Sequence, residues 1–294
     1  MSNDTATAAT SSVLRGNHGR MNLFAAYIIV SIVAVMIIIP LLWLIGASLK
    51  TLPEIANFAW FPRVPQWRNY IDGLTEMKFA RYFFNSTYIA VVNVVGGSFV
   101  AAMAGYAFGR LRFPGRNIMF GLVLSTMMLP FAAIMIPSFV IFRTLRWIDT
   151  YTVMTVPFIL AVPAFYIFLM RQYFLTIPRE LDDAAKMDAC GYYRIFWSIL
   201  LPLCKPALTT VAIYAFMANW GNLIRAVLFL NSADMRTVPV GLALLNLQLE
   251  EPALKVHLMM SNSVLYIVPP LIIFIVFQKY FTRFGSELSS MTGK

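Results

Sequence analysis

Long stretches of apolar residues constrain this chain more than any other feature of its sequence. A helix needs about 20 mainly apolar residues to cross the hydrocarbon core of a bilayer. Only 12% of the 294 residues are charged, whereas about 25% is usual in soluble domains. Runs of sufficient length occur six times, at Leu23–Leu49, Phe83–Phe108, Ile118–Phe142, Tyr151–Tyr173, Leu208–Leu230 and Val256–Phe281. The sequence therefore predicts an all-α integral membrane protein with six transmembrane helices.

The two ends of the chain differ from this apolar pattern. Residues 1–20 are rich in Ser, Thr, Ala and Asn without apolar periodicity, which predicts a disordered tail. We expect a transmembrane domain over residues 21–284 and a second tail over residues 285–294. An even number of spans places both termini on one side, and the basic stretch GRLRFPGR between the second and third runs favours the cytoplasm under the positive-inside rule.

One polar segment, residues 177–206, separates the fourth run from the fifth. Pro178 suits the first position of a helix. The carboxylates that follow favour the positive end of the helix dipole: Glu180, Asp182 and Asp183. We expect ion pairs between Asp182 and Lys186 and between Arg179 and Asp183. A small, partly apolar surface for a partner is formed by Leu181, Ala184, Ala185 and Met187. Gly191 can turn the chain into a second short helix, Tyr192–Leu200.

The residue order in this segment resembles the EAA loop of permease subunits of binding-protein-dependent ABC importers. That pattern is an acid with two alanines, then Asp-Gly, then spaced Phe, Ile, Leu-Pro and Pro. The matching positions are Asp183, Ala184, Ala185, Asp188, Phe196, Ile199, Leu201, Pro202 and Pro206. The resemblance implies a cytoplasmic coupling helix that docks in a groove of a separate ATPase subunit, with Asp183 facing a basic group of that subunit.

Two positions depart from the family pattern. Asp183 replaces the usual Glu, and Ala189 stands where the family has Gly. We expect Gly191 to relieve the turn instead. The residues implied in coupling are Glu180, Asp183, Ala184, Ala185, Asp188, Ala189, Gly191 and Phe196.

Further stretches extend the resemblance to the maltose-type carbohydrate permeases over nearly the whole chain. They are the segments Tyr106–Arg116, Thr237–Leu242 and Pro269–Tyr280, and the final Met-Thr-Gly-Lys. The resemblance implies a multi-pass subunit of a bacterial inner membrane. Its implied partners are a homologous second permease subunit, two ATPase subunits that hold ATP and Mg, an extracytoplasmic solute-binding protein and membrane lipid.

The fifth apolar run contains an unusual polar group. It consists of Asn219, Trp220, Asn222 and Arg225. An ionisable residue within a span faces a protein interior or water and is a candidate functional residue. Our hypothesis is that these residues line the substrate pathway and that Arg225 favours a substrate with carboxylates. Alternatively, Arg225 reaches the outer interface by snorkelling.

Several other classes of function are disfavoured by the sequence. We expect no catalytic residues, metal site or bound cofactor, because the chain has two histidines and two cysteines without metal-ligand spacing and has no phosphate-binding loop of the GxxxxGK type. The net charge of +10 is dispersed among short loops, which does not predict a nucleic-acid partner. All Asp and Glu lie in expected loops or tails, so a proton relay within the bilayer is also disfavoured.

The preferred interpretation is a non-enzymatic permease subunit that imports a sugar or oligosaccharide by ATP-driven alternating access. A permease for a peptide or polyamine is the alternative within this class. From other classes, a stand-alone carrier or channel and a structural membrane scaffold remain open.

Overall fold

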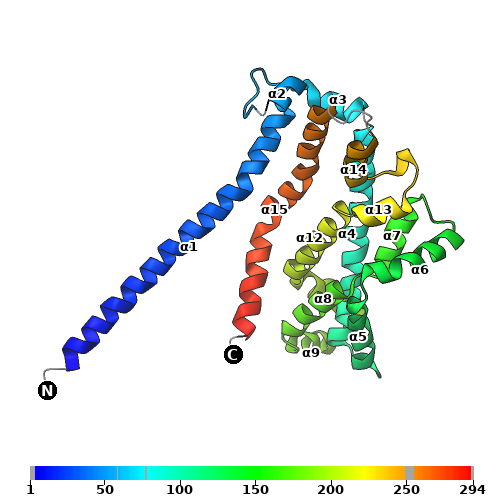
Figure 1. Cartoon of the computed structure of the whole chain (residues 1–294). Helices are drawn as coiled ribbons and strands as arrows, with labels where there is room; N and C mark the ends of the chain where they lie inside the picture. Colours follow the sequence, from blue (N-terminus) through cyan, green and yellow to red (C-terminus); the bar gives the residue numbers. More distant parts are fainter. Residues whose placement is uncertain (1–3, 58, 77, 249–254, 293–294) are drawn as a thin grey trace. The chain divides into compact units, whose positions relative to one another are not determined.

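Every regular element that the structure describes is a helix (Figure 1). The computed structural model describes residues 4–292 except residues 58, 77 and 249–254, and it describes side chains in residues 26–244 and 255–278, again without residues 58 and 77. The chain divides into two compact units. The first comprises Met1–Ile71 and Ala253–Val264, and the second comprises Asp72–Pro252 and Leu265–Lys294.

In the first unit, the buried Asn69 joins three segments. The unit contains α1 (Asp4–Ser48), α2 (Leu52–Ala56), the start of α3 (Arg68–Glu76) and the first turns of α15 (Val256–Thr292). The Asn69 amide donates to the carbonyl oxygens of Ser48 and Lys50 at 2.9 and 3.0 Å, and its own carbonyl accepts from Ser261 Oγ at 2.9 Å. These hydrogen bonds satisfy backbone groups that the end of α1 leaves free.

The connection between α2 and α3 is held by a carboxylate. Glu54 accepts hydrogen bonds from the backbone amides of Thr51 and Arg63 at 3.0 and 2.9 Å. The Thr51 bond and then the Arg63 bond lower the pKa of Glu54, because both favour its charged form. The start of α2 and the following loop are therefore fixed by one side chain.

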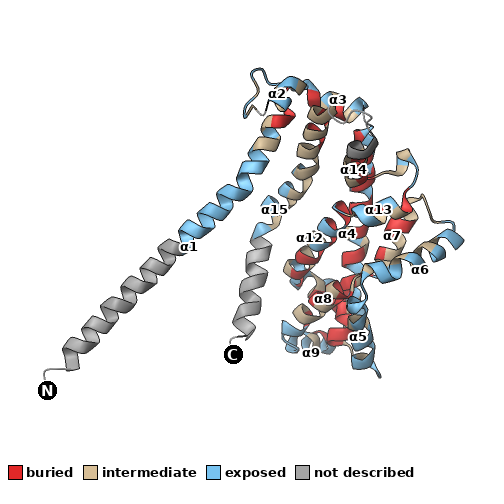
Figure 2. Ribbon diagram, in the orientation of Figure 1, coloured by how far each residue is buried: buried red, intermediate tan, exposed pale blue. Residues whose placement is uncertain are grey.

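Helix α4 (Phe79–Arg110) is the centre of the second unit and is packed by α7 (Tyr151–Leu160), α8 (Ala164–Thr176) and α12 (Lys205–Trp220). Figure 2 shows buried residues along α4 and on the helices around it. Glycines allow the close approach. A Cβ on Gly105 would lie 2.6 Å from Met170 Cβ, and one on Gly97 would lie 2.7 Å from the Phe158 ring. Small residues serve the same purpose at helix contacts in membranes generally.

The other helical elements that lie wholly within the second unit are all shorter than α4. They are α5 (Arg116–Ser125), η1 (Thr126–Met128), α6 (Phe131–Thr144), α9 (Glu180–Met187), α10 (Tyr192–Arg194), the π-helix η2 (Ile195–Leu200), α11 (Leu201–Leu203), α13 (Leu223–Phe229), η3 (Ala233–Met235) and α14 (Val238–Gln248).

Four helical segments of the described chain are long and apolar enough to cross a membrane. They are Ala26–Ser48, Phe79–Arg110, Tyr151–Thr176 and Val256–Gln278. Two bent pairs raise the possible number to six: Arg116–Met128 with Phe131–Thr144 at 100°, and Tyr192–Leu203 with Lys205–Trp220 at 78°. Pro130 lies at the first bend, where its missing N–H prevents continuation of the helix. The structure thus confirms an all-helical protein with four to six candidate spans.

The prediction of one continuous helix from Leu208 to Leu230 is wrong. Helix α12 ends at Trp220, and α13 begins at Leu223. Asn222 causes this separation, since its side chain accepts a hydrogen bond from the Arg225 amide at 3.2 Å and so caps a new helix. The apolar pair that could cross the membrane here instead begins earlier, at Tyr192.

Within the described residues, the segments predicted to be terminal tails belong to the first and last helices. Helix α1 begins at Asp4, and α15 continues to Thr292. The side chains of residues 1–25 and 279–294 lie outside the described part, as does the Glu250–Glu251 pair. The domain boundaries at residues 20 and 285 therefore stay predictions.

Candidate functional site

The polar segment folds as the two short helical stretches that its sequence predicts. The first is α9, whose first turn contains Glu180, Asp182 and Asp183 and whose last turn contains Lys186. Acidic side chains at the start of a helix and a basic side chain at its end both interact favourably with the helix dipole. After a turn at residues 188–191, α10, η2 and α11 form the second stretch.

The turn after α9 is made by Ala189. Its φ of 53° is left-handed, which is unfavourable for a residue with a Cβ. The Ala189 amide donates to the Lys186 carbonyl, and the Cys190 amide donates to the Ala185 carbonyl, both at 2.9 Å. This is the Schellman pattern that ends many helices. Asp188 is the residue between helix and turn.

The expectation that Gly191 would relieve this turn is wrong. Gly191 has φ −71° and ψ 160°, an extended conformation open to any residue, and it precedes α10. The left-handed residue is Ala189, at the position where the related loops have Gly. The hydrogen bonds of the Schellman turn fix that position, because they count from the end of α9.

The inner side of the segment is anchored by aromatic contacts. Phe196 and Ala185 are buried in the main core cluster of the second unit. The Phe196 ring lies 5.1 Å from Tyr106 of α4 and 6.5 Å from Phe174 of α8, measured between centroids. The Tyr106 hydroxyl also donates to the Tyr192 carbonyl at 3.2 Å. The second helical stretch is therefore attached to both α4 and α8.

A buried ion pair attaches α9 to the end of α4. Arg110 Nη1 lies 3.4 Å from Asp182 Oδ2, and the two side chains are only 3% and 14% exposed. Arg110 Nη2 also donates to the Ile177 carbonyl at 2.6 Å. From the sequence, Arg110 was used only as one of the basic residues that indicate membrane orientation, and this contact was not predicted. Its signal was a position just after the apolar run Phe83–Phe108.

The ion pairs predicted within α9 differ from those observed. Lys186 pairs with Asp183, not with Asp182, at 3.1 Å and in an exposed position. No pair between Arg179 and Asp183 occurs among the ion pairs of the described residues. Asp182 faces α4, so it is unavailable to Lys186.

The outer side of α9 is apolar and uncovered. Leu181, Ala184 and Met187 are exposed at three-residue spacing, and Met187 is 88% exposed. Asp183 is exposed beside this stripe, and Glu180 is exposed at its start. Of the two alanines of the motif, Ala185 points inward and Ala184 outward. An apolar stripe with an adjacent acid is suited to a protein partner.

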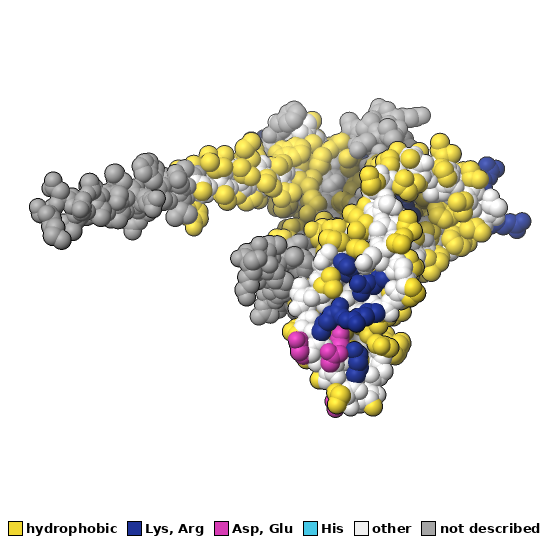
Figure 3. Space-filling view, turned by 90° about the horizontal axis from the view of Figure 1, so that it is seen from below, with side chains coloured by type: hydrophobic (Ala, Val, Ile, Leu, Met, Phe, Trp, Pro, Cys, Tyr) yellow, Lys and Arg dark blue, Asp and Glu magenta, His cyan; other side chains and the backbone are white. Residues whose placement is uncertain are grey.

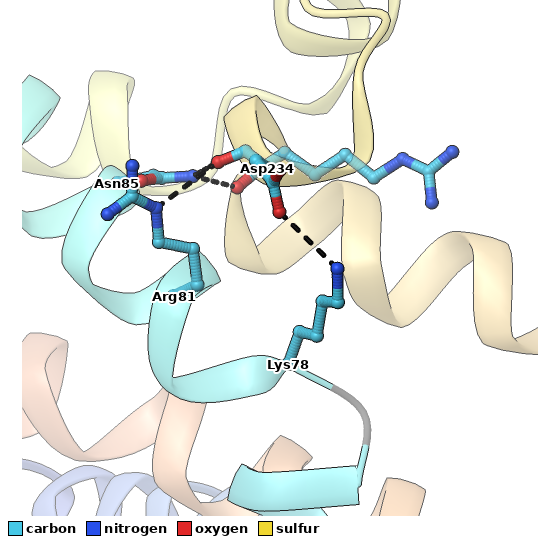
Figure 4. Close-up of polar contacts among 5 residues, drawn as sticks. Lys78, Arg81, Asn85 and Asp234 are labelled. Carbon is cyan, nitrogen blue, oxygen red and sulfur yellow. Dashed lines mark hydrogen bonds and ion pairs between the residues drawn. The ribbon is translucent and has the colours of Figure 1, made fainter.

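The opposite end of α4 is attached to η3 (Figure 4). The Asn85 amide donates to the carbonyls of Asp234 and Arg236 at 2.8 and 2.7 Å. Arg81 Nε donates to the Asp234 carbonyl, and Lys78 Nζ lies near Asp234 Oδ1, both at 3.4 Å. One helix therefore connects the α9 segment at one end with the η3 turn at the other.

Two of the predicted pathway residues are engaged in helix packing. Asn219 is buried, and its Oδ1 accepts from Asn93 of α4 at 2.6 Å. Asn93 also donates to the Met154 carbonyl of α7 at 3.0 Å. Sequence reasoning missed Asn93, although an amide in an otherwise apolar run was a usable signal.

The Trp220 ring is stacked parallel to two aromatic rings. Phe216 lies at 5.4 Å and 17°, and Tyr266 at 5.8 Å and 11°. Its Nε1 donates to the Tyr266 carbonyl at 3.1 Å. The Trp220 side chain thus links α12 to α15.

The other two predicted pathway residues belong to α13. Asn222 caps that helix through its side chain. Arg225 is half-buried, and its buried Nε has no hydrogen-bond partner among the described residues. The structure separates the four residues into two helices with different surroundings, and their role in a substrate pathway stays a prediction.

Residues 94–287 match the sequence profile of a known family, described as "Binding-protein-dependent transport system inner membrane component". This chain belongs to that family. The permease is 38% identical over 254 residues to the arabinooligosaccharides transport system permease protein of Halalkalibacterium halodurans, an alignment that covers 85% of this chain and 89% of the relative. It is 29% identical to the sulfoquinovosyl glycerol transport system permease protein of Agrobacterium fabrum, over 86% and 88% of the two chains.

A solved structure has the same fold as the permease. It is a bacterial ABC transporter involved in the import of the acidic polysaccharide alginate. One of its chains superposes with a TM-score of 0.80 at 26% identity, covering 89% of the permease and 97% of that chain. The expected kinship with sugar permeases is confirmed.

The left-handed Ala189 gives a prediction about stability. Ala189→Gly should raise the free energy of unfolding by about 1 kcal/mol, because the left-handed conformation costs alanine roughly 1–2 kcal/mol and glycine almost nothing, less the greater chain entropy of glycine. Thermal or denaturant unfolding of the purified permease in detergent measures this. Gly191→Ala is the matched control and should be neutral or slightly stabilising, since its φ is ordinary and a Cβ there meets open space. A destabilising Ala189→Gly would contradict the assigned turn.

The ion pair of Arg110 gives a second prediction. Asp182→Asn should lower the free energy of unfolding by about 3 kcal/mol or more, because it leaves a buried guanidinium without its counter-charge. Asp183→Asn should cost less than about 1 kcal/mol, since its pair with Lys186 is exposed. A double-mutant cycle with Arg110→Gln measures the coupling of the first pair, and one with Lys186→Gln measures that of the second. Equal coupling energies in the two cycles would refute the distinction.

Proposed function

We propose that this permease is the membrane subunit of an ATP-driven importer for a sugar or oligosaccharide, and that α9 is the helix on which a separate ATPase subunit docks. The observation that carries the proposal is the two-sided character of α9. Its inner side is fixed to α4 by Asp182, and its outer stripe of Leu181, Ala184 and Met187 is uncovered. Asp183, beside that stripe, is the acid that meets a basic group of the ATPase.

Motion of α9 passes to the membrane helices through rigid contacts. Arg110 and the aromatic pair of Tyr106 with Phe196 connect the segment to α4. Helix α4 has 32 residues and so extends for about 48 Å at 1.5 Å per residue. A displacement at its Arg110 end therefore reaches Asn85 and η3 at the other end. ATP binding and hydrolysis by the ATPase subunits supply the displacement. The substrate pathway of the complex then opens alternately to the two sides of the membrane.

The proposed topology counts each bent pair as one span. The permease then has six spans, and both termini and α9 lie in the cytoplasm. Arg110, Arg112 and Arg116 lie at the same membrane face as α9, as the positive-inside rule requires. The η3 turn, at the other end of α4, lies on the outer side.

The proposed complex contains further subunits. A homologous second permease subunit completes the pathway, two ATPase subunits hold ATP and Mg, and a solute-binding protein delivers substrate from outside the membrane. The permease binds no cofactor of its own and performs no bond chemistry. The inner membrane of a bacterium is the proposed location.

An acidic group on the substrate is favoured by Arg225. Its buried Nε has no acceptor in the described part of the chain, and a guanidinium binds a carboxylate or sulfonate through two parallel hydrogen bonds. Two of the similar proteins are named for anionic substrates, alginate and sulfoquinovosyl glycerol, whereas the arabinooligosaccharides relative is named for neutral ones. Arg225 is therefore proposed to select between these two classes of oligosaccharide.

Disruption of the outer stripe should uncouple the subunits. Met187→Glu is expected to weaken ATPase binding tenfold or more, because full burial of a Met side chain contributes about 1.5–3 kcal/mol. Co-purification of the ATPase subunit and ATP-dependent uptake into liposomes measure the effect. Val64→Glu, at an exposed apolar position of the first unit, is the matched control and should leave ATPase binding unchanged. Solute uptake by the permease alone, without ATPase subunits, would overturn the proposal.

Substitution of Arg225 tests the substrate class. Arg225→Leu should reduce uptake of an acidic oligosaccharide about tenfold or more and leave uptake of a neutral arabinooligosaccharide unchanged, since only the former loses a charge-assisted hydrogen bond. ATP hydrolysis stimulated by each loaded binding protein gives a second reading. The exposed Arg143→Leu serves as a control for the loss of one positive charge. Unchanged uptake of every acidic sugar would remove Arg225 from the pathway.

A further inference from the structure

Three arginines from two separate segments line one groove beside α9. Arg112 lies in the turn between α4 and α5, Arg116 is the first residue of α5, and Arg179 directly precedes α9. The groove has a volume of about 600 Å³ and also includes Phe113 and Ile118. Figure 3 shows Lys and Arg side chains gathered on the face seen from below, beside a smaller group of Asp and Glu.

The positive charge of this groove is not neutralised by the nearby acids. Asp182 and Asp183 line the adjoining groove, but Asp182 pairs with Arg110 and Asp183 pairs with Lys186. Among the described residues, neither Arg112 nor Arg179 forms an ion pair with a carboxylate.

Within the described residues, the third arginine of the groove has neutral acceptors only. The Arg116 guanidinium donates to the Leu111 carbonyl at 3.1 Å and to Asn117 Oδ1 at 3.4 Å. Three guanidinium groups that share one groove repel one another, and none of them forms an ion pair with a carboxylate in the described part of the chain. A bound anion removes that repulsion, and arginine forks match the oxygens of a phosphate especially well.

An apolar surface continues from the cationic groove. Ile118 lines the groove and is 73% exposed, and Leu122, one helical turn further on the same side of α5, is 64% exposed. Helix α5 belongs to a candidate membrane span, Arg116–Met128 with Phe131–Thr144. The cationic end of the groove is therefore continuous with an apolar side formed by Ile118 and Leu122.

We propose that this groove binds the phosphate of an anionic phospholipid, with an acyl chain along Ile118 and Leu122. A free nucleotide or an acidic protein loop matches the arginines but leaves the apolar side uncovered. The lipid phosphate bridges Arg112 and Arg116 to Arg179, and so fastens the start of α9 to the turn after α4. Binding of the lipid does not rest on the coupling role proposed for α9.

Lipid retention by the full-length permease tests the proposal. The wild type and the double variant Arg112→Gln with Arg179→Gln are reconstituted in nanodiscs of phosphatidylcholine with or without phosphatidylglycerol, and native mass spectrometry counts the retained phosphatidylglycerol. Removal of each arginine should weaken retention roughly fivefold, as basic residues near an anionic membrane surface contribute about that factor. The control is Arg63→Gln with Arg143→Gln, two exposed arginines outside the groove, which should retain lipid as the wild type does.

A second variant distinguishes the positive charge of the arginines from their fork geometry. Arg112→Lys with Arg179→Lys keeps the positive charge but loses the fork geometry, and it should retain an intermediate amount of lipid. Equal thermal stability of all variants in phosphatidylcholine alone shows that they are folded. If a variant is unfolded, its two single substitutions replace it.

Three outcomes would overturn the lipid assignment. The first is equal retention of phosphatidylglycerol by the wild type and the double glutamine variant. The second is displacement of the lipid by inorganic phosphate or glycerol phosphate at concentrations similar to that of the lipid, which would indicate a site for a soluble phosphate. The third is loss of the ATPase subunit from the double glutamine variant in both lipid mixtures, which would make the groove a protein contact.

Discussion

Close packing along α4 is the constraint on which the second unit depends. Gly105 and Gly109 lie one helical turn apart and face the backbone of α8 near Arg171, so that α8 can approach without intervening side chains. The same approach places the end of α8 beside the last residue of α4. Ile177 then comes within hydrogen-bond distance of Arg110, and α9 begins at a fixed place. Without glycine at these positions, the two helices could not lie close enough for that contact.

A buried charge at the end of a membrane helix is costly unless it is paired. Arg110 meets this requirement through Asp182 and one backbone carbonyl, and its pairing fixes the rotation of α9 about its own axis. That rotation determines that Ala185 is buried and that Ala184 and Met187 are exposed. The surface offered to a partner is thus a consequence of how one inner charge is neutralised. The same end of the unit carries Arg112, Arg116 and Arg179, none of which forms an ion pair with a carboxylate among the described residues. This end therefore presents an apolar surface and a separate cationic one.

The polar residues of the later helices show how buried amides serve packing in an apolar protein. Asn93 and Asn219 hydrogen-bond to each other and to backbone carbonyls, which satisfies most of their capacity inside the helix bundle. Trp220 uses its Nε1 in the same way. A polar residue in an apolar run therefore indicates a buried contact as readily as a substrate pathway. Arg225 differs from them, because its buried Nε has no acceptor among the residues that the structure describes.

The sequence by itself determined the properties that arise within about 20 neighbouring residues. Apolar length predicted the membrane helices, and the acids and prolines of residues 177–206 predicted two short helices with a turn between them. The order of residues around Ala184 was enough to identify the family. One local signal was missed because the run Leu208–Leu230 is apolar throughout most of its length. Asn222 within it caps a new helix.

Only the tertiary structure decided which side of each helix faces inward. Asp182 and Asp183 are adjacent and chemically alike, yet successive residues of a helix point about 100° apart, so one lies against α4 and the other against solvent. Their partners could not be read from spacing within α9, because Arg110 comes from a different helix. The left-handed residue is likewise set by hydrogen bonds counted from the end of α9, and these select Ala189 over the glycine two positions later. Pairing between distant segments and the rotation of each helix depend on the packing of the whole unit, which no local pattern contains.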